Sequence, residues 1–274
     1  MKTHQRNECD SCSHSRSPHL TRLGINSDRF EFTVALAGNP NTGKSTVFNR
    51  LTGLRQHTGN WPGKTVTRAE GGFIYRDKRY KLIDLPGTYS LLSNTADEEI
   101  ARNFILFGQP DVTVIVVDAM RLERNLNLVL QILEITEKSV LCLNLVDEAS
   151  RHRITVNETK LAADLGVPVV PATARKGVGM AELLKAIHDV VHGLYPCRPH
   201  RIRIESETVR SAVEMLVEKL RAAYPGLPNT RWIALRLLEG DVSVIEAVRN
   251  NELASLGHDP MVEKGIDAVR AVAK

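Results

Sequence analysis

The chain has 274 residues, of which 42% are hydrophobic and 25% charged, and its net charge is +4. This composition is typical of a globular protein with one large or two modest domains. The small and evenly spread charge argues against nucleic acid or membrane lipid as the main partner. The most apolar segments are much shorter than the roughly 20 residues that span a bilayer, and residues 1–20 lack the apolar core of a secretory signal.

Four cysteines are too few for a disulfide framework, so a reducing cytoplasm is the expected compartment. Cys9 and Cys12 form a C-x-x-C pair with histidines nearby, and such residues suit zinc or iron. A structural site normally needs a second ligand pair held by folded chain. Residues 1–29 are polar and without periodicity, and we interpret them as a flexible tail. Metal binding by its cysteines and histidines stays open as an alternative.

From residue 30 to residue 193, strand-like segments alternate with helical ones. This alternation predicts an α/β domain with a doubly wound, mostly parallel sheet. Residues 59–68 are expected to lie in a loop that leads into the next strand, and Asp97 is expected to cap a helix. The expected strands are 30–38, 67–75, 79–84, 112–118, 139–144 and 167–171, and the expected helices are 42–53, 97–108, 124–137, 157–165 and 179–192.

After two prolines near residue 197, strand signals almost vanish. Apolar residues at helical spacing over 206–223 predict a long helix, and shorter ones are expected at 231–240, 242–250 and 263–273. Residues 194–274 are therefore predicted to form a small all-α domain.

Residues 38–45 read GNPNTGKS and match the P-loop pattern G-x-x-x-x-G-K-[ST] between a predicted strand and helix. Backbone N–H groups of such a loop converge on phosphate oxygens at a helix N-terminus. Lys44 would reach the β- and γ-phosphates, and the Ser45 hydroxyl would bind Mg²⁺. The residues expected to hold the phosphates are Gly38, Asn39, Asn41, Thr42, Gly43, Lys44, Ser45 and Thr46.

Two further motifs follow in the order found in GTPases. In IDLPG, Asp84 would hold Mg²⁺ through water, and the Gly87 amide would sense the γ-phosphate. In LNLVDE, Asn144 and Asp147 form N-x-x-D, and Asp147 can accept hydrogen bonds from guanine N1–H and its exocyclic amine. Adenine offers no such donor pair, so the site is expected to select GTP or GDP.

Two loops complete the predicted nucleotide site. Thr173 and Ala174 lie where GTPases place a backbone amide that reads the guanine O6. Residues 59–68, GNWPGKTVTR, occupy the position of switch I, which supplies a threonine to Mg²⁺ and the γ-phosphate. Thr65 and Thr67 are both candidates from position alone.

The stretches GNPNTGKSTVFNRLTG, GNWPGKTVTR, DLPGTYSL and NLVDEA resemble the cytosolic amino-terminal part of bacterial ferrous-iron transport protein B, FeoB. The resemblance covers the G domain over 30–193, and the helical segment resembles the family's regulatory helical domain. It implies a GTPase on the cytoplasmic side of the inner membrane that regulates Fe(II) uptake. The implied partner is a membrane-embedded permease region of the same protein, which is absent here, so we expect a truncated chain.

The resemblance also assigns roles in the predicted active site. It selects Thr65 as the switch I ligand, and it makes Asn41 the residue that places K⁺ beside the phosphates. The carbonyls of Gly59 and Trp61 would complete the shell of that ion. Trp61 is accordingly expected to act through its carbonyl and by shielding the site, more than by core packing. Thr88 replaces the glutamine that many GTPases carry after D-x-x-G, so slow, K⁺-stimulated hydrolysis is expected.

Two other functions compete with this interpretation. An RNA- or ribosome-associated assembly GTPase would need a basic appendage, but residues 198–274 carry 12 basic and 11 acidic side chains. A scaffold that binds GTP without hydrolysis is disfavoured because Lys44, Ser45, Thr65 and Asp84 are all present. The sequence leaves open whether the chain forms a homo-oligomer.

Overall fold

The computed structural model describes residues 29–53, 56–62, 64–92, 95–201, 206–227, 229–250 and 253. The Cys9–Cys12 pair and the helix expected at 263–273 lie outside these residues. Within them, no helix combines the length and the hydrophobicity needed to cross a bilayer.

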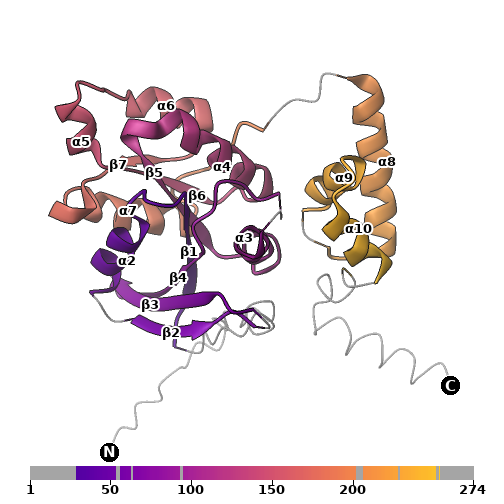
Figure 1. Cartoon of the computed structure of the whole chain (residues 1–274), viewed down its shortest axis with the longest axis horizontal. Coiled ribbons are helices and arrows are strands. Elements are labelled where there is room, and N and C mark those ends of the chain that lie inside the picture. The colour runs from indigo at the N-terminus through magenta and orange to yellow at the C-terminus, as the bar shows by residue number, and fades with distance from the viewer. Residues whose placement is uncertain are drawn as a thin grey trace, which may run out of the picture.

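A seven-stranded sheet forms the centre of the first domain, with the strand order β2-β3-β4-β1-β5-β6-β7 (Figure 1). The β2–β3 and β3–β4 pairs are antiparallel, and all other neighbours are parallel. This confirms the predicted doubly wound, mostly parallel sheet. The strands are β1 (Phe32–Gly38), β2 (Gln56–Asn60), β3 (Thr67–Tyr75), β4 (Lys78–Asp84), β5 (Val112–Asp118), β6 (Ser139–Asn144) and β7 (Val169–Pro171).

Helices cover both faces of the sheet and create two apolar cores. Val47, Phe48 and Leu183 pack on one face, whereas Phe104 and Ile132 pack on the other. The central strand β5 is buried along its whole length, as expected for a parallel strand covered on both faces. The helices of this domain are α2 (Lys44–Thr52), α3 (Ala96–Phe107), α4 (Leu122–Ile135), α5 (Val146–Arg151), α6 (Glu158–Leu165) and α7 (Met180–Val191).

Three further helices, α8 (Glu207–Ala223), α9 (Thr230–Leu238) and α10 (Val242–Arg249), form a separate helical unit beside α3 (Figure 1). Arg102 of α3 lies 3.7 Å from Asp241, which precedes α10. Arg231 of α9 lies 3.6 Å from Glu134 of α4. Ion pairs therefore join the helical unit to the helices on one face of the sheet.

Three local predictions were wrong. Residues 59 and 60, expected in a loop, belong to the edge strand β2, because backbone pairing with β3 needs no apolar alternation. A short helix, α5, follows Asn144 where none was expected. Thr95, not Asp97, caps α3, and its hydroxyl accepts a hydrogen bond from the Glu98 amide at 3.3 Å. Asp97 lies in the first turn of α3, where its negative charge interacts favourably with the helix dipole.

Candidate functional site

The predicted phosphate loop connects β1 to α2 at the edge where the parallel strands end. Strand order reverses on either side of β1, and ligands of doubly wound sheets bind at such switch points. Gly43 has φ of +82°, and a Cβ there would lie 2.3 Å from Asn144 Nδ2, so only glycine fits. Asn41 has φ of +66° and an exposed side chain. The predicted loop therefore has the backbone that its motif requires.

The Asn39 side chain lies beneath this loop and is 2% exposed. Neither polar atom of its amide has a hydrogen-bond partner among the described residues. Its backbone carbonyl accepts a hydrogen bond from Thr42 Oγ1 at 2.9 Å. A buried amide without partners costs about 1–3 kcal/mol, so the loop retains hydrogen-bonding capacity for a polar ligand.

Lys44 and Asp84 come together although they are 40 residues apart, and the lysine ammonium forms an ion pair with the carboxylate. Burial raises the pKa of the Asp84 carboxyl above its usual range, and the charge of Lys44 opposes this rise. Ser45 and Thr46 lie in the first turn of α2 next to this pair. The structure thus brings the P-loop lysine and the D-x-x-G aspartate together in the predicted phosphate and Mg²⁺ site.

The D-x-x-G segment runs directly against the phosphate loop. Leu85 N donates to Leu36 O at 3.0 Å, and Thr88 N donates to Gly38 O at 3.3 Å. A Cβ at Gly87 would lie 3.4 Å from the backbone of Pro40. The D-x-x-G segment is therefore in direct backbone contact with the loop that would hold the phosphates.

Asn144 links the phosphate loop to the predicted base-recognition loop. It is 1% exposed, its Nδ2 donates to Thr42 O at 2.9 Å, and its Oδ1 accepts from Ala174 N at 3.0 Å. The Ala174 amide, expected to read guanine O6, is thus bound to Asn144. Thr173, next to it, is 5% exposed.

A cavity of about 490 Å³ opens beside Asp147. Lys176 Nζ lies 2.8 Å from the Asp147 carboxylate and holds the pKa of that carboxyl below its usual range. The carboxylate is therefore ionised and can accept hydrogen bonds. The residues lining the cavity are Leu145, Asp147, Glu148, Arg151, Thr173, Ala174, Arg175 and Lys176.

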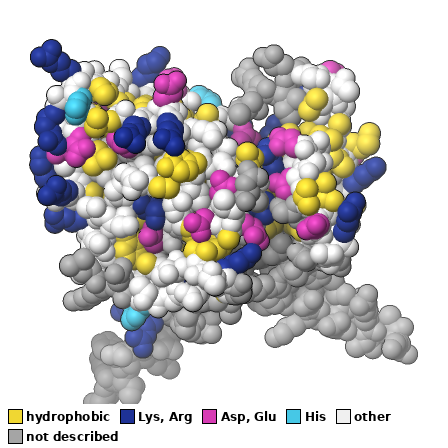
Figure 2. Space-filling view, in the orientation of Figure 1, with side chains coloured by type: hydrophobic (Ala, Val, Ile, Leu, Met, Phe, Trp, Pro, Cys, Tyr) yellow, Lys and Arg dark blue, Asp and Glu magenta, His cyan; other side chains and the backbone are white. Residues whose placement is uncertain are grey.

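Basic side chains gather on the side of the molecule that carries α2 and α5 (Figure 2). Exposed members of this group near the cavity are Arg50, Arg151, Arg175 and Lys176. Such a surface favours an anionic ligand.

Thr65 is exposed on the loop that joins β2 to β3, and it stays a predicted Mg²⁺ ligand. Ala69, four residues further along the chain, pairs with Asp84. Gly59 lies within β2 opposite Arg68, and the carbonyl of Trp61 accepts a hydrogen bond from Lys64 N at 3.0 Å. The Trp61 carbonyl would therefore share or give up this hydrogen bond if it were to bind a cation.

Trp61, expected to act through its carbonyl and by shielding more than by packing, packs into the core. Its side chain is 3% exposed and meets Phe104 of α3 edge to face, with ring centroids 5.6 Å apart. Arg68 lies over the indole at 5.3 Å. Neighbouring glycine and proline hid this contact from sequence reasoning, because the partner ring lies 43 positions away on another element.

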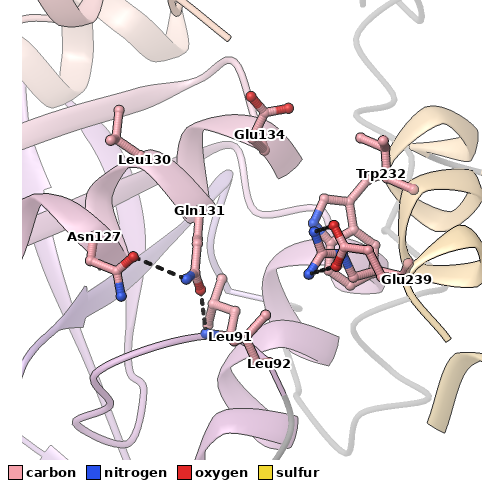
Figure 3. Close-up of a pocket in the computed structure, with 10 residues that line it drawn as sticks. Leu91, Leu92, Asn127, Leu130, Gln131, Glu134, Trp232 and Glu239 are labelled. Atoms are coloured by element: carbon pink, nitrogen blue, oxygen red, sulfur yellow. Dashed lines mark hydrogen bonds and ion pairs between the residues drawn. The ribbon is translucent and has the colours of Figure 1, made fainter. Parts of the chain in front are cut away.

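A second cavity, of about 440 Å³, lies between the segment after D-x-x-G, α4 and α9 (Figure 3). Leu91 and Leu92 lie at one side and Trp232 at the other. Leu91 N donates to Gln131 Oε1 at 2.6 Å, which ties this segment to α4. Sequence reasoning did not find this cavity, because its walls come from three distant parts of the chain.

Comparisons with known proteins agree on one family. The family model described as "Ferrous iron transport protein B" matches residues 32–187, and "FeoB cytosolic helical domain" matches residues 206–271. The Fe(2+) transporter FeoB of Salmonella typhimurium is 40% identical over 221 residues, and that of Escherichia coli K12 is 39% identical over 224 residues. Each match covers 77% of this chain but only 27% of the relative's length.

Solved structures give the same result. The cytosolic domain of the T. maritima FeoB iron transporter in its GDP form I is 37% identical, with a TM-score of 0.72, covering 83% of this chain and 86% of that one. The cytosolic domain of L. pneumophila FeoB is 32% identical, with a TM-score of 0.69, covering 82% and 96%. With a family model over more than half of its length and a matching fold, the chain belongs to the ferrous iron transport protein B (FeoB) family.

Proposed function

We propose that this chain binds GTP and GDP and hydrolyses GTP slowly. The observation that carries this proposal is the joining of the phosphate loop, Asp84 and the Asp147 cavity at one edge of the sheet through Lys44 and Asn144. Relatives with this fold were solved in GDP and GMPPNP forms, which supports a guanine nucleotide as the ligand here.

Some side chains of the site would bind the nucleotide, and others would stabilise the charge that develops during hydrolysis. Lys44 would leave its pair with Asp84 to hold the β- and γ-phosphates, and the Gly87 amide would contact the γ-phosphate. Asp147 would leave Lys176 and accept two hydrogen bonds from guanine. Water would attack the γ-phosphorus in line with the bond to the departing GDP, and fixed positive groups around the phosphates would stabilise the charge that develops.

The residues fit the two expected cations. Ser45 and Thr65 would bind Mg²⁺ directly, and Asp84 would act through water. The burial of Asp84 makes a nearby cation favourable. Asn41, with the Gly59 and Trp61 carbonyls, would hold K⁺. When bound, these ions supply positive charge that offsets the charge on the phosphates.

We further propose that the chain is the cytoplasmic part of a bacterial inner-membrane Fe(II) transporter and regulates uptake through its nucleotide state. Helix α3 offers the connection: Phe104 packs on Trp61 of the expected switch I, and Arg102 pairs with Asp241 of the helical unit. The cavity in Figure 3 gives the segment after D-x-x-G room to move against α9. The helical unit would slow GDP release and relay the state of both switches.

The test of nucleotide function compares GDP with ADP in binding, and GTP with ATP in phosphate release. We expect strong preference for the guanine nucleotides, and loss of hydrolysis in Lys44→Ala. Equal binding of GDP and ADP would refute the proposal.

The regulatory proposal is tested by Asp241→Asn, which weakens the pair with Arg102. GDP should dissociate faster from this variant than from Glu207→Gln, which alters an exposed pair on α8. Unchanged GDP release in Asp241→Asn would argue against coupling through α3. Fe(II) uptake is tested in cells that depend on a complete reading frame containing this chain, where Lys44→Ala should abolish uptake.

A further inference from the structure

Arg50 connects the helix that follows the phosphate loop to the predicted base-recognition loop. It lies in the last turn of α2, and its Nε donates to Ala174 O at 3.1 Å across 124 positions of sequence. Its Nη2 donates to the next carbonyl, that of Arg175. The planar guanidinium thus holds two successive carbonyls of the turn at 174–176.

The same loop is held from its buried side by Asn144, which accepts a hydrogen bond from the Ala174 amide. Asn144 restrains one amide, whereas Arg50 restrains the carbonyls that follow it. Hydrogen bonds from a charged donor are stronger than neutral ones. Release of Arg50 would therefore free the outer part of the loop while leaving its buried anchor in place.

Helix α2 gives this contact a wider consequence. Lys44 begins the helix, and Arg50 follows six residues later, or about 9 Å along the axis. One short rigid element therefore carries both a phosphate-binding residue and a side chain that holds the base-recognition loop. The position of the loop is set relative to the phosphate loop, which fixes the distance between the two ends of a bound nucleotide.

We propose that Arg50 is a positioning residue for guanine recognition. With the Ala174 amide bound to Asn144, Arg50 holds residues 173–177 where the next amide, that of Arg175, can reach the O6 atom of the base, and it does so without touching the nucleotide. The proposal rests on the guanine-nucleotide function proposed above, and it adds a residue that sets base selectivity and nucleotide residence time.

The test uses Arg50→Gln in the full chain, with Arg50→Lys as the conservative variant and Lys185→Gln as the matched control. Lys185 is an exposed cation on α7 that pairs with Asp189 at 3.0 Å, away from the loop. Competition against a fluorescent GDP gives affinities for GDP, IDP and ADP, and stopped flow gives the GDP dissociation rate. Circular dichroism establishes that each variant is folded.

Comparing the affinities for GDP, IDP and ADP distinguishes a role of Arg50 in reading O6 from a general role in stability. Inosine keeps the O6 and N1–H of guanine and lacks only the exocyclic amine that Asp147 would bind, whereas adenine lacks O6. If Arg50 positions the O6-reading amide, Arg50→Gln should lower GDP and IDP affinity together by about fivefold, as expected for one charge-assisted hydrogen bond at the surface. The GDP/ADP ratio should fall by the same factor, and the GDP/IDP ratio should stay unchanged.

Arg50→Lys, with one donor group in place of the fork, should recover part of the loss, and Lys185→Gln should behave as wild type. An equal loss for GDP, IDP and ADP would mean that Arg50 merely stabilises α2, and the proposal would be overturned. Unchanged selectivity and dissociation in Arg50→Gln would overturn it as well. A wild-type chain without preference for GDP over ADP would instead refute the proposed function, and the positioning role with it.

Discussion

Replacing Trp61 by alanine tests how the hairpin of the expected switch I is held in this structure. A buried tryptophan removes roughly 200 Å² from water, worth about 5 kcal/mol at 25 cal/mol per Å². The indole Nε1–H has no hydrogen-bond partner among the described residues, which offsets this by about 1–3 kcal/mol. The net contribution is about 3 kcal/mol, in line with the usual cost of a large-to-small core substitution.

The loss should be local, because Trp61 directly follows the edge strand β2 and pins it to α3 through Phe104. A change of about 3 kcal/mol in local opening corresponds to about a 100-fold faster amide exchange. Hydrogen exchange followed by mass spectrometry should show this acceleration in β2 of Trp61→Ala, while the amides of β5 keep wild-type rates. The measurement is made on the nucleotide-free protein.

Trp61→Phe is the matched control. It keeps an aromatic ring against Phe104 and removes the unpartnered N–H, so exchange in β2 should stay within about threefold of wild type, a difference of less than 1 kcal/mol. Unchanged β2 exchange in Trp61→Ala would refute the anchoring role. Equal acceleration in β2 and β5 would show that Trp61 supports the whole domain instead of the hairpin.

Three further predictions concern single side chains. Asn41→Gly removes the side-chain amide, and glycine still adopts the φ of +66° at this position. In phosphate-release assays this variant should hydrolyse GTP equally fast in K⁺ and Na⁺. A rate that is still higher in K⁺ would show that Asn41 does not bind the cation. Asp147→Asn should weaken GDP binding by about 100-fold and favour xanthosine diphosphate, whose 2-oxo group can accept a hydrogen bond from the new amide. Competition binding measures both affinities, and unchanged base selectivity would contradict the prediction. The pKa of His188 lies below its usual 6.5 because burial and the neighbouring His192 disfavour its charged form, and its Nδ1 lies 2.8 Å from the Tyr80 hydroxyl. As the pH drops below 6.5, His188 is protonated in the unfolded chain before it is protonated in the folded one, which favours unfolding. The urea concentration at the unfolding midpoint should therefore decrease from pH 7.5 to pH 5.5 in wild type and decrease less in His188→Gln. An equal decrease in both proteins would contradict this.

The structure explains why the Tyr80–His188 pair accompanies a neutral imidazole, because burial disfavours the charged form of His188. Burial also raises the pKa of Tyr80 to about 12, so its phenol keeps its proton and can donate to Nδ1 of the neutral ring. Protonated His188 could not accept this hydrogen bond. The stability that this pair contributes is therefore complete above pH 6.5 and is lost as the pH falls through the lower pKa of the folded state.

Much of the nucleotide site could be predicted from local sequence. The P-loop, Asp84 and Asn144 each follow an apolar strand, and strands of a doubly wound sheet end at one edge, so their order along the chain predicts their meeting in space. The turn before Lys78 was also predictable from its charged residues, and the structure places Arg76 and Asp77 there with positive φ.

Other features depend on partners that no local pattern reveals. Strand β2 is polar and forms only because β3 offers its backbone at the edge of the sheet. Arg50 finds its carbonyls 124 residues away, and Lys176 reaches Asp147 from the neighbouring loop. Arg102 is buried against Asp241 of another structural unit.

The sequence by itself determined the alternation of strands and helices and the chemistry of the phosphate loop, because both depend on residues close together in the chain. Only the tertiary structure decided that residues 56–60 form an edge strand and that Trp61 packs into the core. The physical reason is that an edge strand and an aromatic contact gain their free energy from distant elements. Contacts with distant elements leave no periodic pattern in the sequence of the segment that they stabilise.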